Sequence, residues 1–173
     1  VMTHLGPAAA CALALYESTV IGDASKGTLF SSEFNLRSVT RHILEPQGAS
    51  YTTTSTPFLV SDQLDFHPTD VCEDADGSLL VTDTGGWYKL CCPTSQLMKP
   101  DVLGAIYRIR RSDQPTLEDP RGLELSWALN ENLAPRLGDA RTAVRKRAID
   151  QLAISKAVAP LTNLLEQESA TVA

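Results

Sequence analysis

The chain has 173 residues, of which 43% are hydrophobic, and this is enough for one medium domain or a small domain with an appendage. Its formal net charge is −6 at pH 7, so it lacks the clustered Lys and Arg that nucleic-acid binding requires, and nucleic acid is excluded as a partner. The longest apolar run, residues 7–15, is about half the length that crosses a bilayer, so neither a membrane span nor a signal peptide is expected in this segment. Because the chain begins at Val1 and not with Met, we expect it to be a fragment of a longer protein.

Residues 7–111 show short apolar runs separated by Gly, Pro, Asp, Asn and Ser, which is typical of an all-β fold. Asp76-Gly77, between two apolar runs, is the strongest hairpin signal in this part. The expected strands are Ala10 to Glu17, Thr28 to Glu33, Ser38 to Leu44, Ser50 to Val60, Thr69 to Glu73, Ser78 to Thr82 and Ala105 to Arg110.

After Arg111 a polar linker, residues 112–122, leads to a part in which apolar residues recur at helical spacing. A first helix is expected around Pro135, which interrupts it, and a second helix follows Asp139, which is placed to cap it by accepting a backbone N–H bond. The apolar positions are Leu125, Trp127, Leu129, Leu133 and Leu137 for the first helix, Val144, Ala148, Ile149 and Leu152 for the second, and Leu161, Leu164 and Leu165 for a third.

The stretch LGDARTAVRKRAIDQLA, followed by AVAPLTNLL, resembles a HEAT-type helical repeat. The positions that carry the resemblance are Asp139, Val144, Arg145 and Ala148. It implies antiparallel helices that approach closely at small residues, with Arg145 hydrogen-bonded to the turn carboxylate beside it. Because such repeats stack on one another, we expect a solenoid whose surface is available to a protein partner.

The stretch FHPTDVCEDADGSLLVTDTGGWY, followed by GAIYRIRR, resembles part of a six-bladed β-propeller of the glucose/sorbosone dehydrogenase type, in the form called a membrane-bound dehydrogenase domain in planctomycete-like bacteria. THLGPAAACALALYES and KGTLFSSEFNLRSVTRHIL fit the preceding blade, whereas DGSLLVTD alone also occurs in binding propellers of the NHL kind. The expected fold class is mainly β plus α. It comprises the last two blades of a six-bladed β-propeller (residues 1–111), a linker (112–122) and the start of a HEAT-type α-solenoid (123–173).

The resemblance implies an oxidoreductase in the complete protein. It would be exported to the periplasm or cell envelope of a bacterium and would oxidise a sugar or an alcohol by hydride transfer to pyrroloquinoline quinone, with calcium holding the cofactor. The fragment by itself is expected to be inactive. The alternative is a non-enzymatic scaffold that binds a protein or polysaccharide partner, because propellers host both kinds of function.

Five residues are candidates for the site of such an enzyme. His4 and His67 are candidate general bases that would take a hydroxyl proton. Arg37 has the fixed fork of donors that clamps a carboxylate or a quinone oxygen, although an ion pair on the blade surface is the alternative. Asp83, at the end of a strand, and Trp87, in the loop that follows, are expected at the rim of a cofactor pocket.

Other polar residues are expected to have no catalytic or metal-binding role. His42 lies in the middle of a strand, at a solvated or cross-strand position. The carboxylates around Asp74 lack the spacing of a calcium loop and are explained by the hairpin turn, so no metal site is expected in this chain. Cys72 is expected to be buried, and Cys11 is expected to be close enough for a disulfide with Cys91 or Cys92 if neighbouring blades bring the loops together, which would imply an oxidising location.

Overall fold

The structure, a computed structural model, describes residues 3–86, 99–113, 115–128, 133–156, 158 and 161–162. The chain divides into two compact units, Val1–Gln114 and Pro115–Ala173. In the described part of the chain, the first unit is built from seven strands and a short 3-10 helix, and the second contains a 3-10 helix and one α-helix.

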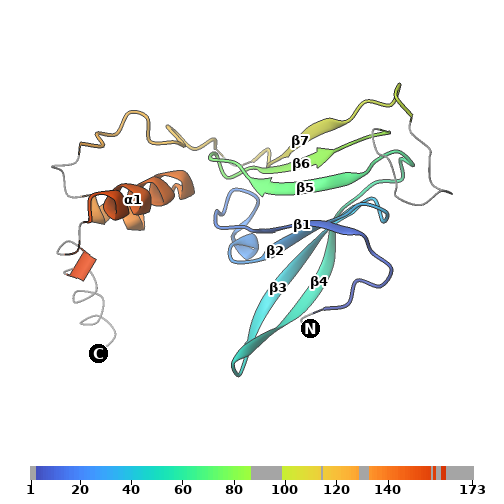
Figure 1. Ribbon diagram of the computed structural model, residues 1–173, viewed down its shortest axis with the longest axis horizontal. Coiled ribbons are helices and arrows are strands. Elements are labelled where there is room, and N and C mark those ends of the chain that lie inside the picture. The colour runs from blue at the N-terminus through green and yellow to red at the C-terminus, as the bar shows by residue number, and fades with distance from the viewer. Residues whose placement is uncertain are drawn as a thin grey trace. The chain divides into compact units, whose positions relative to one another are not determined.

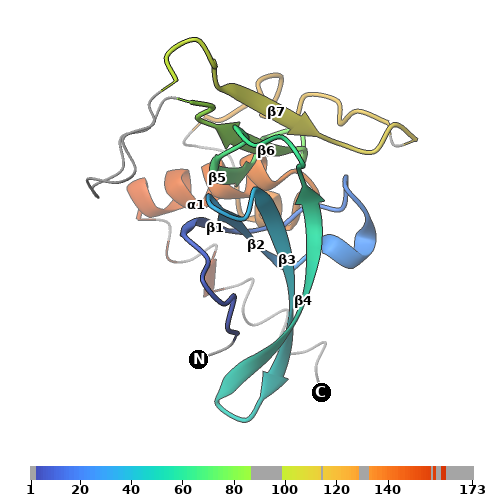
Figure 2. The ribbon, with the colours of Figure 1, turned by 90° about the vertical axis from the view of Figure 1, so that its right-hand side faces the viewer.

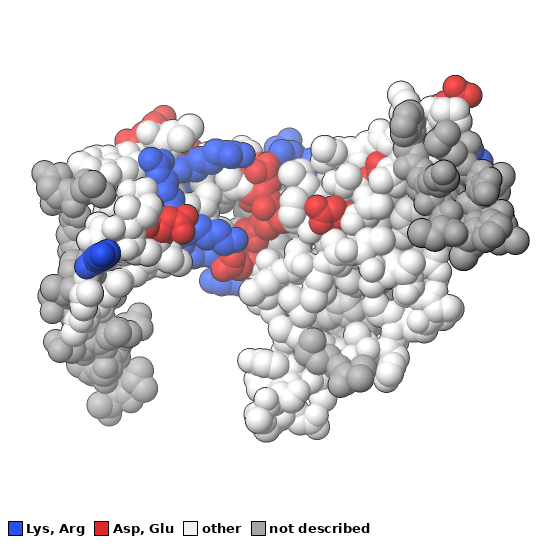
Figure 3. Space-filling model, in the orientation of Figure 1, with Lys and Arg blue, Asp and Glu red and all other residues white. Residues whose placement is uncertain are grey.

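The first sheet of the first unit has four antiparallel strands in sequence order (Figure 1). β3 and β4 form a long twisted hairpin that projects beyond β1 and β2 (Figure 2). In the face shown in Figure 3, the surface around this hairpin displays neither Lys and Arg nor Asp and Glu among the described residues. The elements are β1 (Ala10–Leu15), the 3-10 helix η1 (Asp23–Ser25), β2 (Leu29–Glu33), β3 (Ser38–Gln47) and β4 (Ser50–Val60).

The second sheet has three antiparallel strands, β5 (Pro68–Glu73), β6 (Leu79–Asp83) and β7 (Ala105–Ile109). The β5–β6 turn is closed by the N–H of Gly77, which donates to the carbonyl of Asp74 at 2.9 Å. Gly77 has φ 78, a left-handed conformation that favours glycine. The carboxylates of the turn are bound by a residue of β7, because Arg108 contacts Asp74 at 2.7 Å and Asp76 at 2.9 Å. These carboxylates therefore connect the β5–β6 turn to β7.

The core of the first unit lies between the two sheets, with β5 packed against β1 and β2. Aromatic rings pack edge to face there, since the ring centroids of Phe30 lie 6.0 Å from Tyr16 and 4.9 Å from Phe58. Successive strand residues point to opposite faces, so the core takes only alternate positions of β2 and β3. The buried core residues are Tyr16, Phe30, Val39, Phe66, Val71, Leu79 and Val81.

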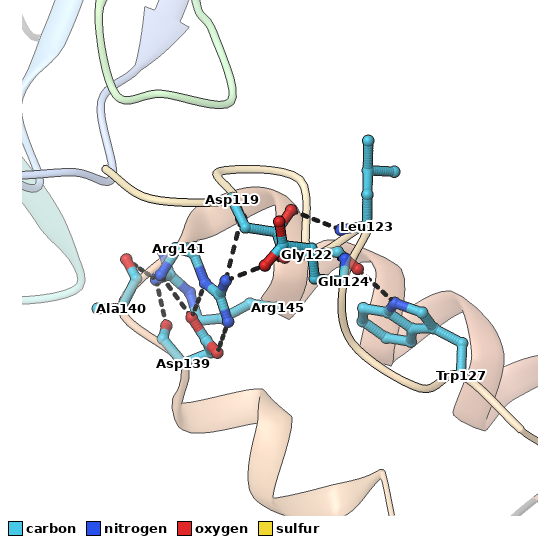
Figure 4. A network of polar contacts seen from close by, with 9 residues as sticks. All are labelled: Asp119, Gly122, Leu123, Glu124, Trp127, Asp139, Ala140, Arg141 and Arg145. Atoms are coloured by element: carbon cyan, nitrogen blue, oxygen red, sulfur yellow. Dashed lines mark hydrogen bonds and ion pairs between the residues drawn. The ribbon is translucent and has the colours of Figure 1, made fainter. Parts of the chain in front are cut away.

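The second unit contains the 3-10 helix η2 (Ala134–Gly138) and the helix α1 (Thr142–Ile154). Figure 4 shows that Arg141, just before α1, joins two turns of the chain. Its guanidinium donates to both carboxylate oxygens of Asp139 at 2.9 Å and to the backbone carbonyl of Asp119 at 3.0 Å. Arg141 is also one cause of the lowered pKa of Asp139, through its side-chain hydrogen bonds.

Trp127 packs within the described segment 115–128, in which no helix forms. Its indole N–H donates to the carbonyl of Gly122 at 2.7 Å (Figure 4). The guanidinium groups of Arg136 and Arg147 lie 4.5 Å and 4.2 Å from the centroid of its ring. This packing gives Trp127 a role in a loop and not on the face of a helix.

The seven expected strands are confirmed, with ends that differ by up to three residues. The expected fold class is wrong, because the described residues form mostly two antiparallel sheets, with α1 as the one α-helix among their elements. No HEAT-like solenoid forms in the described residues. The first predicted helix is absent from the described residues of 123–137, where Pro135 lies in the 3-10 helix η2 and Trp127 packs in a loop.

Within α1 the predicted pattern is correct at three of four positions. Val144, Ala148 and Leu152 are buried at four-residue spacing, whereas Ile149 is 56% exposed. The carboxylate of Asp139 is bound by Arg141, and Arg145 instead donates to the backbone carbonyl of Asp139 at 2.8 Å. Most of the third predicted helix, Val158 to Leu165, lies outside the described residues.

Candidate functional site

Polar side chains gather on the face of the first sheet that is opposite the core. The register pairs Glu33 with Ser38 and Ser31 with Thr40 across β2 and β3. His42 of β3 pairs with Ser55 of β4. Because all of these positions alternate with core positions, their side chains lie on one face.

Glu33 is the centre of this polar cluster, and it is fully buried. Its carboxylate accepts hydrogen bonds from the hydroxyls of Ser31, Ser38 (3.1 Å) and Thr40 (3.0 Å). None of the Lys or Arg side chains in the described residues forms an ion pair with it. The three hydroxyl groups therefore replace the water that a buried carboxylate loses.

His42 extends the cluster toward β4 and is only 3% exposed. Its Nε2 lies 2.8 Å from the hydroxyl oxygen of Ser31, and its Nδ1 lies 2.8 Å from that of Ser55. Burial lowers the pKa of His42, and the charge of Glu33 opposes this only in part, so the ring is neutral at pH 7.

The hydrogen bonds of the cluster determine which group is the donor and which the acceptor in each pair. The hydroxyl proton of Ser31 is donated to Glu33, so its oxygen accepts from Nε2–H of His42. A neutral imidazole carries one proton, and Nδ1 of His42 therefore accepts from the hydroxyl of Ser55. Both ring nitrogens of His42 are engaged.

A pocket of about 380 Å³ opens beside this cluster. Its walls are mostly apolar, and Ser31 and His42 line it from the sheet. Its volume lies within the usual range for sites that bind small organic molecules. The lining residues are Thr3, Leu5, Ala10, Cys11, Ala12, Leu13, Leu29, Ser31, His42 and Thr53.

The N-terminal segment supplies one wall of the pocket and is anchored on both sides of it. The side-chain amide of Asn35 donates to the carbonyl of Pro7 at 2.6 Å, and its Oδ1 accepts from the N–H of Ala9 at 2.6 Å. At the other end, the hydroxyls of Thr3 and Ser55 lie 3.3 Å apart. The pocket is therefore a built feature of the first unit.

Two of the predicted site residues, His67 and Asp83, lie together elsewhere in this unit and are buried. Nδ1 of His67 donates to the carbonyls of Asp65 at 3.1 Å and Gly85 at 2.9 Å, and its ring stacks on Phe34 at 4.5 Å. The carboxylate of Asp83 accepts the backbone N–H groups of His67 and Gly85, both at 2.8 Å. These contacts tie the start of β5 to the end of β6.

Of the other three predicted site residues, the structure describes His4 and Arg37. His4 is exposed, next to the pocket residues Thr3 and Leu5. Arg37 has φ 56 in the β2–β3 turn, and its Nε is buried and makes no hydrogen bond in the described part of the molecule. Trp87 lies outside the described residues.

The cysteine predictions are corrected where the structure describes the residue. Cys72 is exposed and not buried, and Cys11 is an exposed free thiol, so the predicted disulfide of Cys11 is absent. Cys91 and Cys92 lie outside the described residues. Searching the described residues alone gives no group of three or more His, Cys, Asp or Glu arranged to hold a metal ion. The same residues include no helix with the length and apolarity needed to cross a bilayer.

The sequence interpretation missed the cluster around Glu33 and His42, although a usable signal is present. FSSEF places Ser31 and Glu33 two residues apart, and SVTRH places Ser38, Thr40 and His42 at the same spacing. Polar residues at every second position of two strands in a hairpin predict one polar face.

Comparison with known proteins gives a family but no function. No curated protein and no solved structure matches the chain. A family model described as a domain of unknown function, DUF7133, matches residues 2–113, which is more than half of the chain. The match thus spans nearly all of the first unit and both of its sheets. The chain belongs to this family of domains of unknown function.

Proposed function

We propose that the first unit is a non-enzymatic binding module that holds a small organic molecule in the pocket beside Ser31 and His42. The observation that carries this proposal is the pocket itself, about 380 Å³ with mostly apolar walls and two polar groups held in place by hydrogen bonds. Apolar walls with a few fixed polar groups are the usual composition of sites for small molecules.

The donor and acceptor roles of His42 and Ser31 favour binding over catalysis. A general base needs a lone pair within reach of the substrate proton. Nδ1 of His42 uses its lone pair to accept from Ser55, and Nε2 donates to Ser31. The proton of Ser31 is donated to Glu33, so no side chain of the cluster is ready to take a proton from a bound molecule.

Oxidation of a sugar or an alcohol with pyrroloquinoline quinone and calcium stays a prediction for the complete protein. Of its candidate bases, His67 is buried and donates from Nδ1 to two carbonyls, and His4 is exposed. The described contacts of Arg37 and Asp83 offer no paired site for a quinone. Quinone-dependent dye reduction by the full-length parent with a panel of sugars and alcohols tests this prediction.

Pocket filling tests the binding proposal. Ala10, on the edge strand β1, lines the pocket, and Ala10→Phe places a ring in it. Ala105→Phe is the matched control, because Ala105 is an exposed alanine on the edge strand β7 and does not line the pocket. Titration with benzyl alcohol, followed by amide NMR shifts, is expected to move the signals of β1 and β3 in the wild type and in Ala105→Phe, and to leave Ala10→Phe unchanged.

Alkylation of Cys11 gives an independent readout. Cys11 lines the pocket and is exposed, and Cys72 is exposed outside it, so the second thiol is an internal control in the same sample. Benzyl alcohol is expected to slow the alkylation of Cys11 and not of Cys72, as measured by peptide mass spectrometry. Unchanged NMR shifts together with an unchanged rate at Cys11 would disprove the proposal.

A further inference from the structure

Ser31, which lines the pocket from the sheet, carries one hydrogen-bond acceptor that the cluster does not use. The oxygen of Ser31 has one proton, donated to Glu33, and two lone pairs, one of which accepts from His42. Its second lone pair has no partner within the described residues, and Ser31 lines the pocket. His42 has no further N–H to donate, so a molecule that hydrogen-bonds to Ser31 at this point must be the donor.

The negative charge of Glu33, next to Ser31, also favours a ligand that donates a proton in a hydrogen bond. Glu33 is fully buried, is bound by three hydroxyls and forms no ion pair with a described residue. A buried charge acts through a medium of low dielectric, so its field is weakly screened at the adjacent pocket. A positive group there is favoured and a negative group is disfavoured.

We infer that the pocket selects an amphipathic molecule with an apolar body and a hydrogen-bond donor at its polar end. Among donors it prefers a protonated primary amine to a hydroxyl, and it rejects a carboxylate. This inference rests on the proposed binding function and adds the chemical class of the ligand to it. The apolar body contacts residues such as Leu13 and Leu29, and the donor approaches the oxygen of Ser31.

Four probes of similar size, each with one benzene ring, test the inference: benzylamine, benzyl alcohol, toluene and benzoate. Their dissociation constants at pH 7 come from amide NMR titrations of the chain. We expect benzylamine to bind about tenfold more tightly than benzoate, with benzyl alcohol between them and toluene weaker than the alcohol. Benzoate binding as tightly as benzylamine would overturn the inference and leave the proposed binding function intact, whereas no binding by any probe would overturn both.

Glu33→Gln shows whether the buried charge causes the preference. The amide keeps an acceptor for Ser31 and removes the charge. We expect the ratio of benzoate to benzylamine dissociation constants to fall from about tenfold to about twofold or less. Asp113→Asn is the matched control, because it removes one carboxylate that is 60% exposed and must leave the ratio unchanged.

Amide spectra establish that both variants are folded. An unchanged ratio in a folded Glu33→Gln protein would contradict the assigned role of the charge. If this variant does not fold, the ranking of the four probes in the wild type decides the inference.

Discussion

The hydroxyl of Tyr16 links the two sheets of the first unit at a point closed to water. It donates to the carbonyl of Gly77 at 2.6 Å and accepts the N–H of Ile21 at 3.1 Å. Tyr16→Phe keeps the ring in the core and leaves both backbone groups without this partner. We expect the free energy of unfolding, measured in urea, to fall by about 1–3 kcal/mol, because buried polar groups lose a hydrogen bond.

Tyr107→Phe is the control for this change. Tyr107 is 45% exposed, and its hydroxyl makes no hydrogen bond to another described residue. Removal of an exposed hydroxyl changes stability by less than about 0.5 kcal/mol. Equal effects of the two substitutions would show that the contacts of Tyr16 contribute nothing specific.

Tyr16 also makes stability depend on pH in the alkaline range. Burial, with smaller contributions from nearby carboxylates, raises the pKa of Tyr16 from 10 to about 12. The folded state therefore holds the phenolic proton while the unfolded state loses it. The stability contribution is fully present below pH 10 and is lost as the pH rises from about 10 to about 12, with a slope of up to about 1.4 kcal/mol per pH unit.

The difference between wild type and Tyr16→Phe isolates this titration from the lysines and the other tyrosines. We expect the two urea-unfolding free energies to converge between pH 10 and pH 12. A difference that stays constant over this interval would contradict the assigned cause.

At the residue scale, the sequence gives the type of a side chain but not its partners. His67 was a candidate base, and the structure adds that its Nδ1 donates to two carbonyls. His42 was expected at a solvated or cross-strand position, and it is cross-strand but buried. The sequence contains the alternation that puts His42 on one face with Ser31, yet it does not show that the N-terminal segment folds over that face.

At the scale of elements, the β5–β6 turn depends on a glycine for two separate reasons. Gly77 has φ 78, and a Cβ at this position would lie 2.5 Å from Cγ2 of Val20. Gly77→Ala therefore adds a steric overlap to the strain of a left-handed conformation. We expect it to lower the free energy of unfolding by about 2–4 kcal/mol in urea melts.

Gly48→Ala separates the two effects. Gly48, in the β3–β4 turn, has φ 59, but a Cβ there has no atom within 4 Å. This control is expected to cost about 1 kcal/mol, which is the strain alone. A cost at Gly77 no larger than that at Gly48 would show that the Val20 loop moves aside without loss.

The strands were predictable and the helices mostly were not, for a physical reason. Turn residues such as Asp76-Gly77 and an alternation of period two act locally, and all seven strands followed from them. The apolar residues from Leu125 to Leu137 have helical spacing, but Trp127 lies in a loop, where it contacts two guanidinium groups and the carbonyl of Gly122. Such contacts depend on tertiary structure and leave no period in the sequence.

At the scale of the whole first unit, two separate sheets share one core. Val39 of β3 and Val81 of β6 are both fully buried in it. Polar contacts add to the connection, because Glu73 of β5 accepts the N–H of Glu17 at 2.6 Å and the hydroxyl of Ser18 at 2.5 Å. Neither sheet has a second layer of its own among the described elements, so each depends on the other to bury its apolar face.

This dependence predicts that the two sheets unfold together. Val81→Ala removes two buried methyl groups from β6 and is expected to cost about 2 kcal/mol. If the unit unfolds as one body, hydrogen exchange of the slowest amides speeds up by roughly 30-fold in β2 and β3 as well as in β5 and β6. Val39→Ala on the other sheet is expected to give the same result. Val60→Ala is the control, because Val60 on β4 is 67% exposed, and it is expected to lower the free energy of unfolding by less than about 0.5 kcal/mol. Faster exchange confined to the sheet that carries the substitution would mean that each sheet is stable alone, and the shared core would then not be what holds this unit together.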